Sequence, residues 1–191
     1  DFVWPIYNEQ WILHSSDQKG SWHRVRLMDD QIVQLFGKRV ENVEDFSFAS
    51  QISQAEAKKY FIERVRIKRP YTGGILWWNL IDGWPQMSDA VVDYFYRKKI
   101  AYHYIKTSQQ PICLMFDEMR DWHFTLVAAN DTLNEVSGDY EVSDIDSGKI
   151  LAKESIKTVF FKISSSILIT GLNQFFESEN SMGFTCTIST I

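Results

Sequence analysis

The stretch GGILWWNLIDGWPQMSDAVVDYF, residues 73–95, places an apolar run between a glycine turn and a loop rich in carboxylates. The turn is Gly73-Gly74, and the run at 75–78, Ile-Leu-Trp-Trp, has no polar alternation. Such a run is typical of a strand that is covered on both faces in a parallel sheet. We therefore predict a buried strand at 75–78 that leads directly into a functional loop.

Helical patterns surround this predicted strand. Apolar residues repeat at helical spacing within 50–68, and Pro70 ends that pattern. A shorter helix is predicted at 29–37, where a glycine follows the last apolar position, and an amphipathic helix at 97–106. The order helix, strand, loop, helix indicates a piece of a fold that repeats βα units.

Beyond Pro111 the chain changes to short apolar segments that are separated by turn residues. Asn130-Asp131 and the stretch 146–149 are the clearest turns. Regular short strands with period-two alternation predict an antiparallel β-sandwich of immunoglobulin type. The predicted strands are ICLMF (112–116), WHFTLVA (122–128), DYEVSDI (139–145), TVFFKI (158–163), SILITGL (166–172) and FTCTIST (184–190). A linker at 108–111 divides the chain into domains 1–108 and 109–191.

Composition and charge exclude several classes of function. The 191 residues are 45% hydrophobic and carry a net charge of −5, so no basic surface is expected for nucleic acid. No apolar run is long enough to span a membrane, and the start, DFVWPIYNEQ, lacks the pattern of a signal peptide. The first residue is not Met, so we expect a mature product or an excised segment, and the start indicates no compartment.

The sequence predicts neither a metal site nor a cofactor. The four histidines are scattered without metal-ligand spacing, and Gly73-Gly74 precedes a strand rather than opening a helix that could bind phosphate. Cys113 and Cys186 lie in apolar, strand-like segments, where buried thiols are favoured over a disulfide. Asn130-Asp131-Thr132 matches an N-glycosylation triplet, a pattern that often arises by chance.

The loop carries residues that resemble a known family. The likeness is strongest over 73–111 and extends over about the first 110 residues. It rests on Trp78, Asp82, Gly83, Trp84, Pro85, Asp93, Tyr94, Lys99, Ala101, Tyr102, Gln110 and Pro111. In this order they resemble the last strand and helix of the catalytic barrel in glycoside hydrolase family 2, in particular its β-mannosidase and exo-β-glucosaminidase branches.

The resemblance implies a fold class of α/β plus all-β, with a partial (β/α)₈ barrel before the immunoglobulin-like sandwich. A whole barrel needs roughly 200–250 residues, more than the first domain holds. The family's two catalytic carboxylates, about 5–5.5 Å apart in retaining enzymes, are glutamates on the fourth and seventh strands. Both would lie outside this chain. We therefore expect a parent that hydrolyses β-glycosides with retention, and no catalytic residue or activity in these 191 residues alone.

The same resemblance implies a sugar-binding role for four residues. Trp78 would form the floor of the subsite for the hydrolysed sugar, and the Trp78–Asn79 peptide bond would be cis. Asp82 and Trp84 would lie above it and contact sugar hydroxyls. Trp77 should point to the opposite side and pack in the core. Asn79 and Ile81 stand where the family more often has glutamine and asparagine, and the loss of a polar group at Ile81 leaves the sugar preference open.

Other interpretations of these residues stay open. Asp82 could instead cap backbone N–H groups of the loop, and Asp89 and Asp93 are expected to cap the approach to the last helix. His14 is expected at the surface. The whole chain could alternatively be a carbohydrate-binding or scaffold module without catalysis, and the sandwich itself is expected to be structural.

A partial barrel also predicts exposed apolar surface. The substrate of the intact parent would be a β-glycoside or oligosaccharide, whereas the chain itself would dock on the rest of the glycosidase or self-associate. The candidates for this orphaned surface are Phe2, Val3, Trp4, Phe36, Phe46, Phe48 and Phe61.

Overall fold

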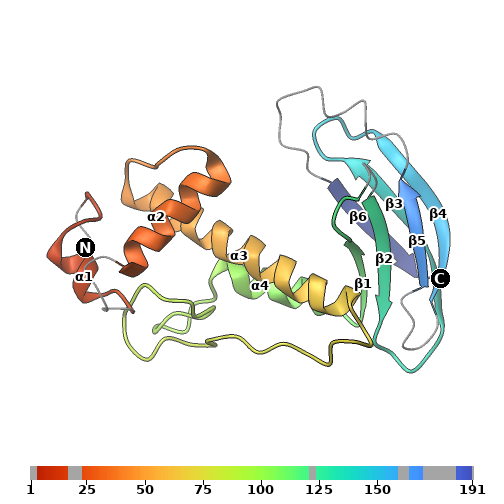
Figure 1. Cartoon of the computed structure of the whole chain (residues 1–191), viewed down its shortest axis with the longest axis horizontal. Helices are drawn as coiled ribbons and strands as arrows, with labels where there is room; N and C mark the ends of the chain where they lie inside the picture. The colour runs from red at the N-terminus through yellow and green to blue at the C-terminus, as the bar shows by residue number, and fades with distance from the viewer. Residues whose placement is uncertain (1–3, 17–22, 121–123, 159–163, 170–183, 191) are drawn as a thin grey trace. The chain divides into compact units, whose positions relative to one another are not determined.

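The computed structural model describes residues 4–16, 23–120, 124–158, 164–169 and 184–190. The chain forms two compact units (Figure 1). The helical unit comprises Asp1–Ile62 and Ile75–Ser108, and the β unit comprises Glu63–Gly74 and Gln109–Ile191. One boundary therefore falls between Ser108 and Gln109. The segment Glu63–Gly74 belongs to the β unit, although it precedes the predicted strand in the sequence.

Capping residues define the ends of several helices. Asn8 caps α1 by accepting from the N–H groups of Gln10 and Trp11, and Asn42 Oδ1 accepts from Asp45 N at 2.8 Å near the start of α3. Gly37, with φ of +74°, follows the last residue of α2. The three predicted helices are confirmed, but α2 and α3 begin earlier than predicted. The helices are α1 (Glu9–Leu13), α2 (His23–Phe36), α3 (Val43–Ile67) and α4 (Ile100–Ser108).

Two apolar clusters form the core of the helical unit. In the first, Trp4, Trp11 and Phe46 meet edge to face, with ring centroids 5.2–6.4 Å apart. Figure 1 shows α3 and α4 side by side, and the second cluster lies between them. The buried members of the first cluster are Ile6, Trp11, Val25, Ile32, Phe46 and Ala49. Those of the second are Ala55, Ile62, Val91, Ala101 and Ile105.

The predicted strand at 75–78 is not formed in this structure. The stretch carries no strand assignment, and no ladder hydrogen bond involves its backbone among the described residues. A strand exists only when a neighbour supplies hydrogen bonds to its N–H and C=O groups. The prediction of a buried strand at 75–78 is therefore wrong for this structure, because the described chain contains no strand that pairs with this run and Leu76 is exposed.

The β unit is built from two antiparallel three-stranded sheets. Their strand orders are β1-β2-β5 and β4-β3-β6, which confirms the predicted antiparallel pairing. The strands are β1 (Ile112–Phe116), β2 (Phe124–Asn130), β3 (Val136–Asp144), β4 (Ile150–Thr158), β5 (Ser164–Ile169) and β6 (Phe184–Thr190). The sequence did not predict β4. Its polar residues suit an edge strand, and Lys153 Nζ lies 3.0 Å from Glu141 Oε2 on β3.

Strand β2 is covered on both faces. Leu126 and Ala128 face a core that includes Tyr140 and Val142 of the other sheet. On the opposite face, Cys113, Met115, Val127 and Ala129 form a second cluster, against which Ile67 at the end of α3 packs. The Sγ atom of Cys113 lies 3.7 Å from the Leu114 carbonyl oxygen, and the residue forms no disulfide. This agrees with the favoured interpretation of a buried thiol, whereas the Cys186 side chain lies outside the description.

Ion pairs further hold the segment Glu63–Gly74 to the β unit. Arg64 pairs with Asp117, and Arg69 pairs with Asp131. Arg66 is buried, and its Nη2 donates to Gln110 O at 2.9 Å and to Asp131 Oδ2 at 3.1 Å. These contacts explain why the end of α3 belongs to the β unit.

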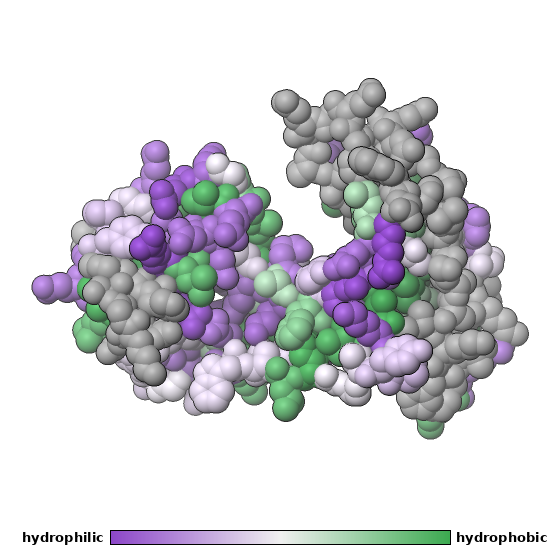
Figure 2. Space-filling model, viewed as in Figure 1, coloured by the Kyte–Doolittle hydropathy of each residue, from purple (hydrophilic) through white to green (hydrophobic). Residues whose placement is uncertain are grey.

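The exposed apolar surface expected of a partial barrel includes residues that were not predicted to belong to it. Phe46 was predicted to be exposed, but it is buried in the first helical cluster, and Trp4 also packs there. Phe36, Phe48 and Phe61 are exposed as predicted, while Phe2 and Val3 lie outside the described residues. Hydrophobic side chains interrupt the polar surface in Figure 2. Large exposed residues that the prediction omitted are Tyr71, Leu76, Trp78, Leu80, Phe95 and Tyr96.

The described part of the chain has neither a helix suited to span a membrane nor a cluster of residues suited to bind a metal ion. None of its helices combines the length and the apolar character needed to cross a membrane. Within 4–16, 23–120 and the described strands, no group of three or more His, Cys, Asp or Glu residues is arranged to hold a metal ion.

Candidate functional site

The loop at 79–99 is organised around one buried carboxylate, that of Asp82. Its side chain is only 1% exposed, and both oxygens have protein partners. Gln86 Nε2 donates to Oδ1 at 3.0 Å, and Ser88 Oγ donates to the same oxygen. Lys99 Nζ lies 3.0 Å from Oδ2. The carboxylate thus connects both ends of the loop, and its partners are side chains rather than the backbone N–H groups that the capping alternative required.

Backbone hydrogen bonds close the loop around this carboxylate. Asp82 N donates to Val92 O at 3.1 Å, and the N–H groups of Val91 and Val92 donate to Leu80 O. Lys99 N donates to Val91 O at 2.9 Å, immediately before α4 begins. The loop is therefore a closed, hydrogen-bonded structure that can hold side chains in fixed positions.

The N-terminal segment contacts the loop at residues 84–87 and stabilises it there. His14 Nδ1 donates to Pro85 O at 2.7 Å, and the His14 ring stacks on Trp84 with centroids 5.3 Å apart. Met87 N donates to His14 O at 2.8 Å, and Ser16 N donates to Met87 O at 3.1 Å. His14 is half-buried, and its ring packs against that of Trp84.

Helices α2 and α3 bind the loop at Asp89 and at the start of α4. Arg24 on α2 forms two contacts of 2.9 Å with the Asp89 carboxylate. Gln54 Nε2 on α3 donates to Asp89 O at 2.8 Å, and Gln51 Oε1 accepts from Ile100 N, the first residue of α4. Asp89 is therefore an anchoring residue, whose carboxylate pairs with α2 rather than capping the approach to the last helix as predicted.

Asp93 caps the turn that leads to α4, as the sequence predicted. Its carboxylate accepts from Phe95 N at 2.9 Å, from Arg97 N at 2.8 Å and from Arg97 Nε at 2.7 Å. Burial by itself would raise the pKa of Asp93, but the hydrogen bonds and charge of Arg97 outweigh burial and hold this pKa below its ordinary value of 3.8.

This lowered pKa predicts an acid-sensitive contribution to stability. A carboxyl whose folded pKa is depressed stabilises the fold fully above its unfolded pKa, and the stabilisation is lost as pH falls through the folded pKa. The variant D93N should therefore be less stable than the parent at about pH 6, and the difference should shrink towards about pH 3. Urea unfolding at both pH values measures this. A difference that stays constant, or that D30N reproduces at the exposed Asp30, would contradict the assignment.

The two adjacent tryptophans face different surroundings, as predicted. Trp77 packs against the cluster between α3 and α4, and Lys58 Nζ lies 5.4 Å from its ring centroid. Trp78 is 79% exposed. The Trp78–Asn79 peptide bond is cis, as the resemblance implied. Asn79 Nδ2 donates to Ile81 O at 3.2 Å, whereas its Oδ1 atom is buried without a hydrogen-bond partner in the described structure.

Comparison with known proteins relates the chain to enzymes that act on glycosides. No family model matches it. Beta-mannosidase B of Aspergillus niger is 33% identical over 88 residues, which cover 44% of this chain and 10% of that protein. Beta-mannosidase B of Thermothelomyces thermophilus is 34% identical over 77 residues, 38% of this chain and 9% of that protein. The chain resembles part of a family 2 glycoside hydrolase. It spans only about a tenth of the length of these curated relatives.

Solved structures show the same relationship at the level of the fold. The β-D-mannosidase of Dictyoglomus thermophilum superposes with a TM-score of 0.69 at 23% identity, covering 93% of this chain and 21% of that one. The exo-chitosanase CsxA of Amycolatopsis orientalis gives a TM-score of 0.63 at 16% identity, with coverage of 93% and 21%. These structures show the shared fold, and together with the sequence relatives they support the family 2-like assignment predicted from the loop residues; the chain matches about a fifth of each solved enzyme.

The carboxylates of the loop are already engaged by other groups of the protein. The loop carboxylates of Asp82, Asp89 and Asp93 all hold lysine, arginine or backbone groups of the chain. Two cavities of the helical unit are lined by other residues than Trp78, Asn79, Asp82 and Trp84. Two rings of the predicted set are exposed, that of Trp78 at 79% and that of Trp84 at 38%.

Sequence reasoning missed the residues that fasten the loop. Lys99 was noted only as part of the family pattern, and Gln86, Ser88 and Arg24 were not singled out. Their partners lie between 4 and 65 residues away, so no local pattern signals them. A buried aspartate in an apolar stretch does require a cation or several donors, and that requirement was the available signal.

Proposed function

We propose that this chain is the C-terminal part of a retaining β-glycosidase of the β-mannosidase type. In this proposal residues 1–108 complete a (β/α)₈ barrel, and residues 109–191 form an immunoglobulin-like support. Both catalytic glutamates belong to other parts of the parent polypeptide. The observation that carries the proposal is coverage: the likeness to a β-D-mannosidase takes in 93% of this chain but only 21% of that enzyme.

Trp78 is the proposed floor of the subsite that holds the hydrolysed sugar. An exposed aromatic ring can pack on the C–H face of a pyranose and fix its orientation. The loop supports this role, because Asp82, Lys99 and the N-terminal segment hold the backbone on both sides of the ring. Asn79 and Trp84 are proposed to line the same subsite.

The proposed part of Asp82 is to position the loop and, through it, the sugar-binding residues. Both of its oxygens are already engaged, and its side chain is almost fully buried. A sugar hydroxyl would have to displace Lys99, Gln86 or Ser88 in order to reach it. This argument favours indirect action over direct contact with substrate.

Activity assays on two polypeptides test the proposal. The 191-residue chain is expected to release no nitrophenol from 4-nitrophenyl β-D-mannoside, β-D-glucoside or β-D-galactoside, because it lacks the two carboxylates that such hydrolysis requires. A longer polypeptide that includes the rest of the barrel is expected to hydrolyse the mannoside with retention. Turnover by the 191-residue chain, or inversion by the longer one, would overturn the proposal.

A further inference from the structure

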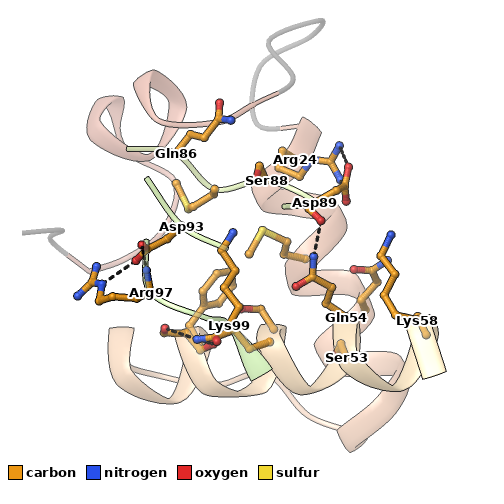
Figure 3. A pocket seen from close by; sticks show the side chains of 18 of the residues that line it. Arg24, Ser53, Gln54, Lys58, Gln86, Ser88, Asp89, Asp93, Arg97 and Lys99 are labelled. Carbon is orange, nitrogen blue, oxygen red and sulfur yellow. Dashed lines mark hydrogen bonds and ion pairs between the residues drawn. The ribbon is translucent and has the colours of Figure 1, made fainter. Parts of the chain in front are cut away.

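One of the cavities in the helical unit forms a groove that lies apart from the four predicted sugar-binding residues. It has a volume of about 800 Å³ and is bounded by α2, by one face of α3 and by the loop segments 86–89 and 97–99. Figure 3 shows this groove, with Lys58 and Gln54 on α3 extending towards the side on which Arg24 and Asp89 lie. Its volume is that of a site for a small molecule rather than of a packing defect.

Cationic residues predominate in the lining, although the chain as a whole has a net charge of −5. The lining contains two aspartates, Asp89 and Asp93. The lining also contains five cationic residues, Arg24, Lys58, Arg97, Lys98 and Lys99. The groove therefore carries a local positive charge that the composition does not predict.

Three of these five cationic residues form ion pairs with aspartates of the same chain. Asp89 pairs with Arg24, Asp93 pairs with Arg97, and the buried Asp82 pairs with Lys99. Two cations, Lys58 and Lys98, form no ion pair in the described structure. Both lie over aromatic rings instead, Lys58 at 5.4 Å from the Trp77 centroid and Lys98 at 4.7 Å from the Tyr102 centroid.

The Lys58 ammonium lies in partly buried surroundings that disfavour its charge. Burial lowers the pKa of Lys58, and the Asp89 carboxylate offsets only part of this effect. A lowered lysine pKa means that the charged form is disfavoured in its surroundings. An anion bound in the groove would supply the missing countercharge in a partly desolvated place, where charge pairs are stronger than at an exposed surface.

The rest of the lining suits a ring-shaped, hydroxyl-bearing ligand. Phe61 provides an apolar face that is half exposed at the groove, whereas Trp11 and Phe46 also belong to the lining but are only 3% and 2% exposed. Hydroxyl and amide groups lie along the same face of α3. They belong to Ser47, Ser50, Gln51, Ser53 and Gln54.

We propose that this groove binds a small acidic saccharide, with Lys58 contacting its anionic group. The anionic group is a carboxylate, as in a hexuronate, or a phosphate ester. This site is distinct from the Trp78 subsite, and binding there involves no hydrolysis. The proposal therefore stands or falls independently of the glycosidase assignment.

Titration calorimetry of the 191-residue chain at low ionic strength tests the proposal, with D-glucuronate, D-mannose 6-phosphate and D-mannose as probes. At least one of the two anions should bind saturably and at least tenfold more tightly than mannose, and added salt should weaken that binding. Binding of glucuronate alone assigns a carboxylate, and binding of mannose 6-phosphate alone assigns a phosphate. Equal affinities for all three, or no binding of either anion, would overturn the proposal.

Variants at two adjacent lysines separate a contact from a general charge effect. K58M should weaken anion binding at least tenfold, whereas K58R should retain most of it. K59M is the matched control, because Lys59 follows on the same helix, carries the same charge and does not line the groove. Equal losses in K58M and K59M would show non-specific attraction and contradict the assigned site. Circular dichroism of each variant establishes that the fold is intact.

Discussion

Replacing Asp82 with alanine is expected to lower the free energy of unfolding of the helical unit by about 3 kcal/mol. The Asp82 side chain is 1% exposed and that of Lys99 is 16% exposed, so the variant leaves a largely buried ammonium without its carboxylate. Gln86 and Ser88 lose their acceptor at the same time. A buried polar group without a partner costs more than the hydrogen bond itself contributed.

Urea unfolding followed by tryptophan fluorescence measures this loss, because six of the seven tryptophans belong to the helical unit. D30A is the matched control: Asp30 lies 3.7–3.8 Å from two arginines at an exposed position, and its removal should change stability by less than about 0.5 kcal/mol. The double variant D82A/K99M should cost less than the sum of the two single changes, since it removes both charges. Additive losses would contradict the paired role.

Local sequence patterns were sufficient to predict the helices, the turns and most of the strands. The repeat within 50–68 and Pro70 fixed the end of α3, and the glycine at 37 marked the end of α2. The early start of α3 could have been recognised from Asn42, which serves as a cap near Val43. Strand β4 was missed because its polar residues weaken the alternation, as expected for a strand at the edge of a sheet.

Long-range contacts are the part that the sequence could not specify. The exposure of Trp78 and the core position of Trp77 follow from the alternation of side chains along an extended segment. The pairing of Asp82 with Lys99, and of Arg24 with Asp89 across 65 positions, depends on how the loop folds back on the helices. The strand predicted at 75–78 failed for a related reason, because strand formation depends on neighbours that the described chain does not contain.

In an active polypeptide that contains the complete barrel, replacing Trp78 with alanine is expected to lower kcat/KM for 4-nitrophenyl β-D-mannoside about 100-fold. The exposed ring offers a large apolar face to the sugar, and losing its contact costs about 3 kcal/mol, which corresponds to roughly two factors of ten in rate. Trp78→Phe should restore part of the rate, because a smaller aromatic ring still packs on a pyranose.

The matched control for this prediction is Tyr71→Ala, because Tyr71 is 93% exposed, is aromatic and lies outside the loop. It should retain most of the parental rate. The stability of Trp78→Ala in urea distinguishes a binding role from a structural one: an exposed side chain contributes little to the fold, so the loss of activity should occur with less than about 1 kcal/mol of destabilisation. A variant that keeps more than half of the parental kcat/KM would remove Trp78 from the sugar subsite. A variant that loses activity only because it unfolds would assign the ring to the packing of the barrel instead.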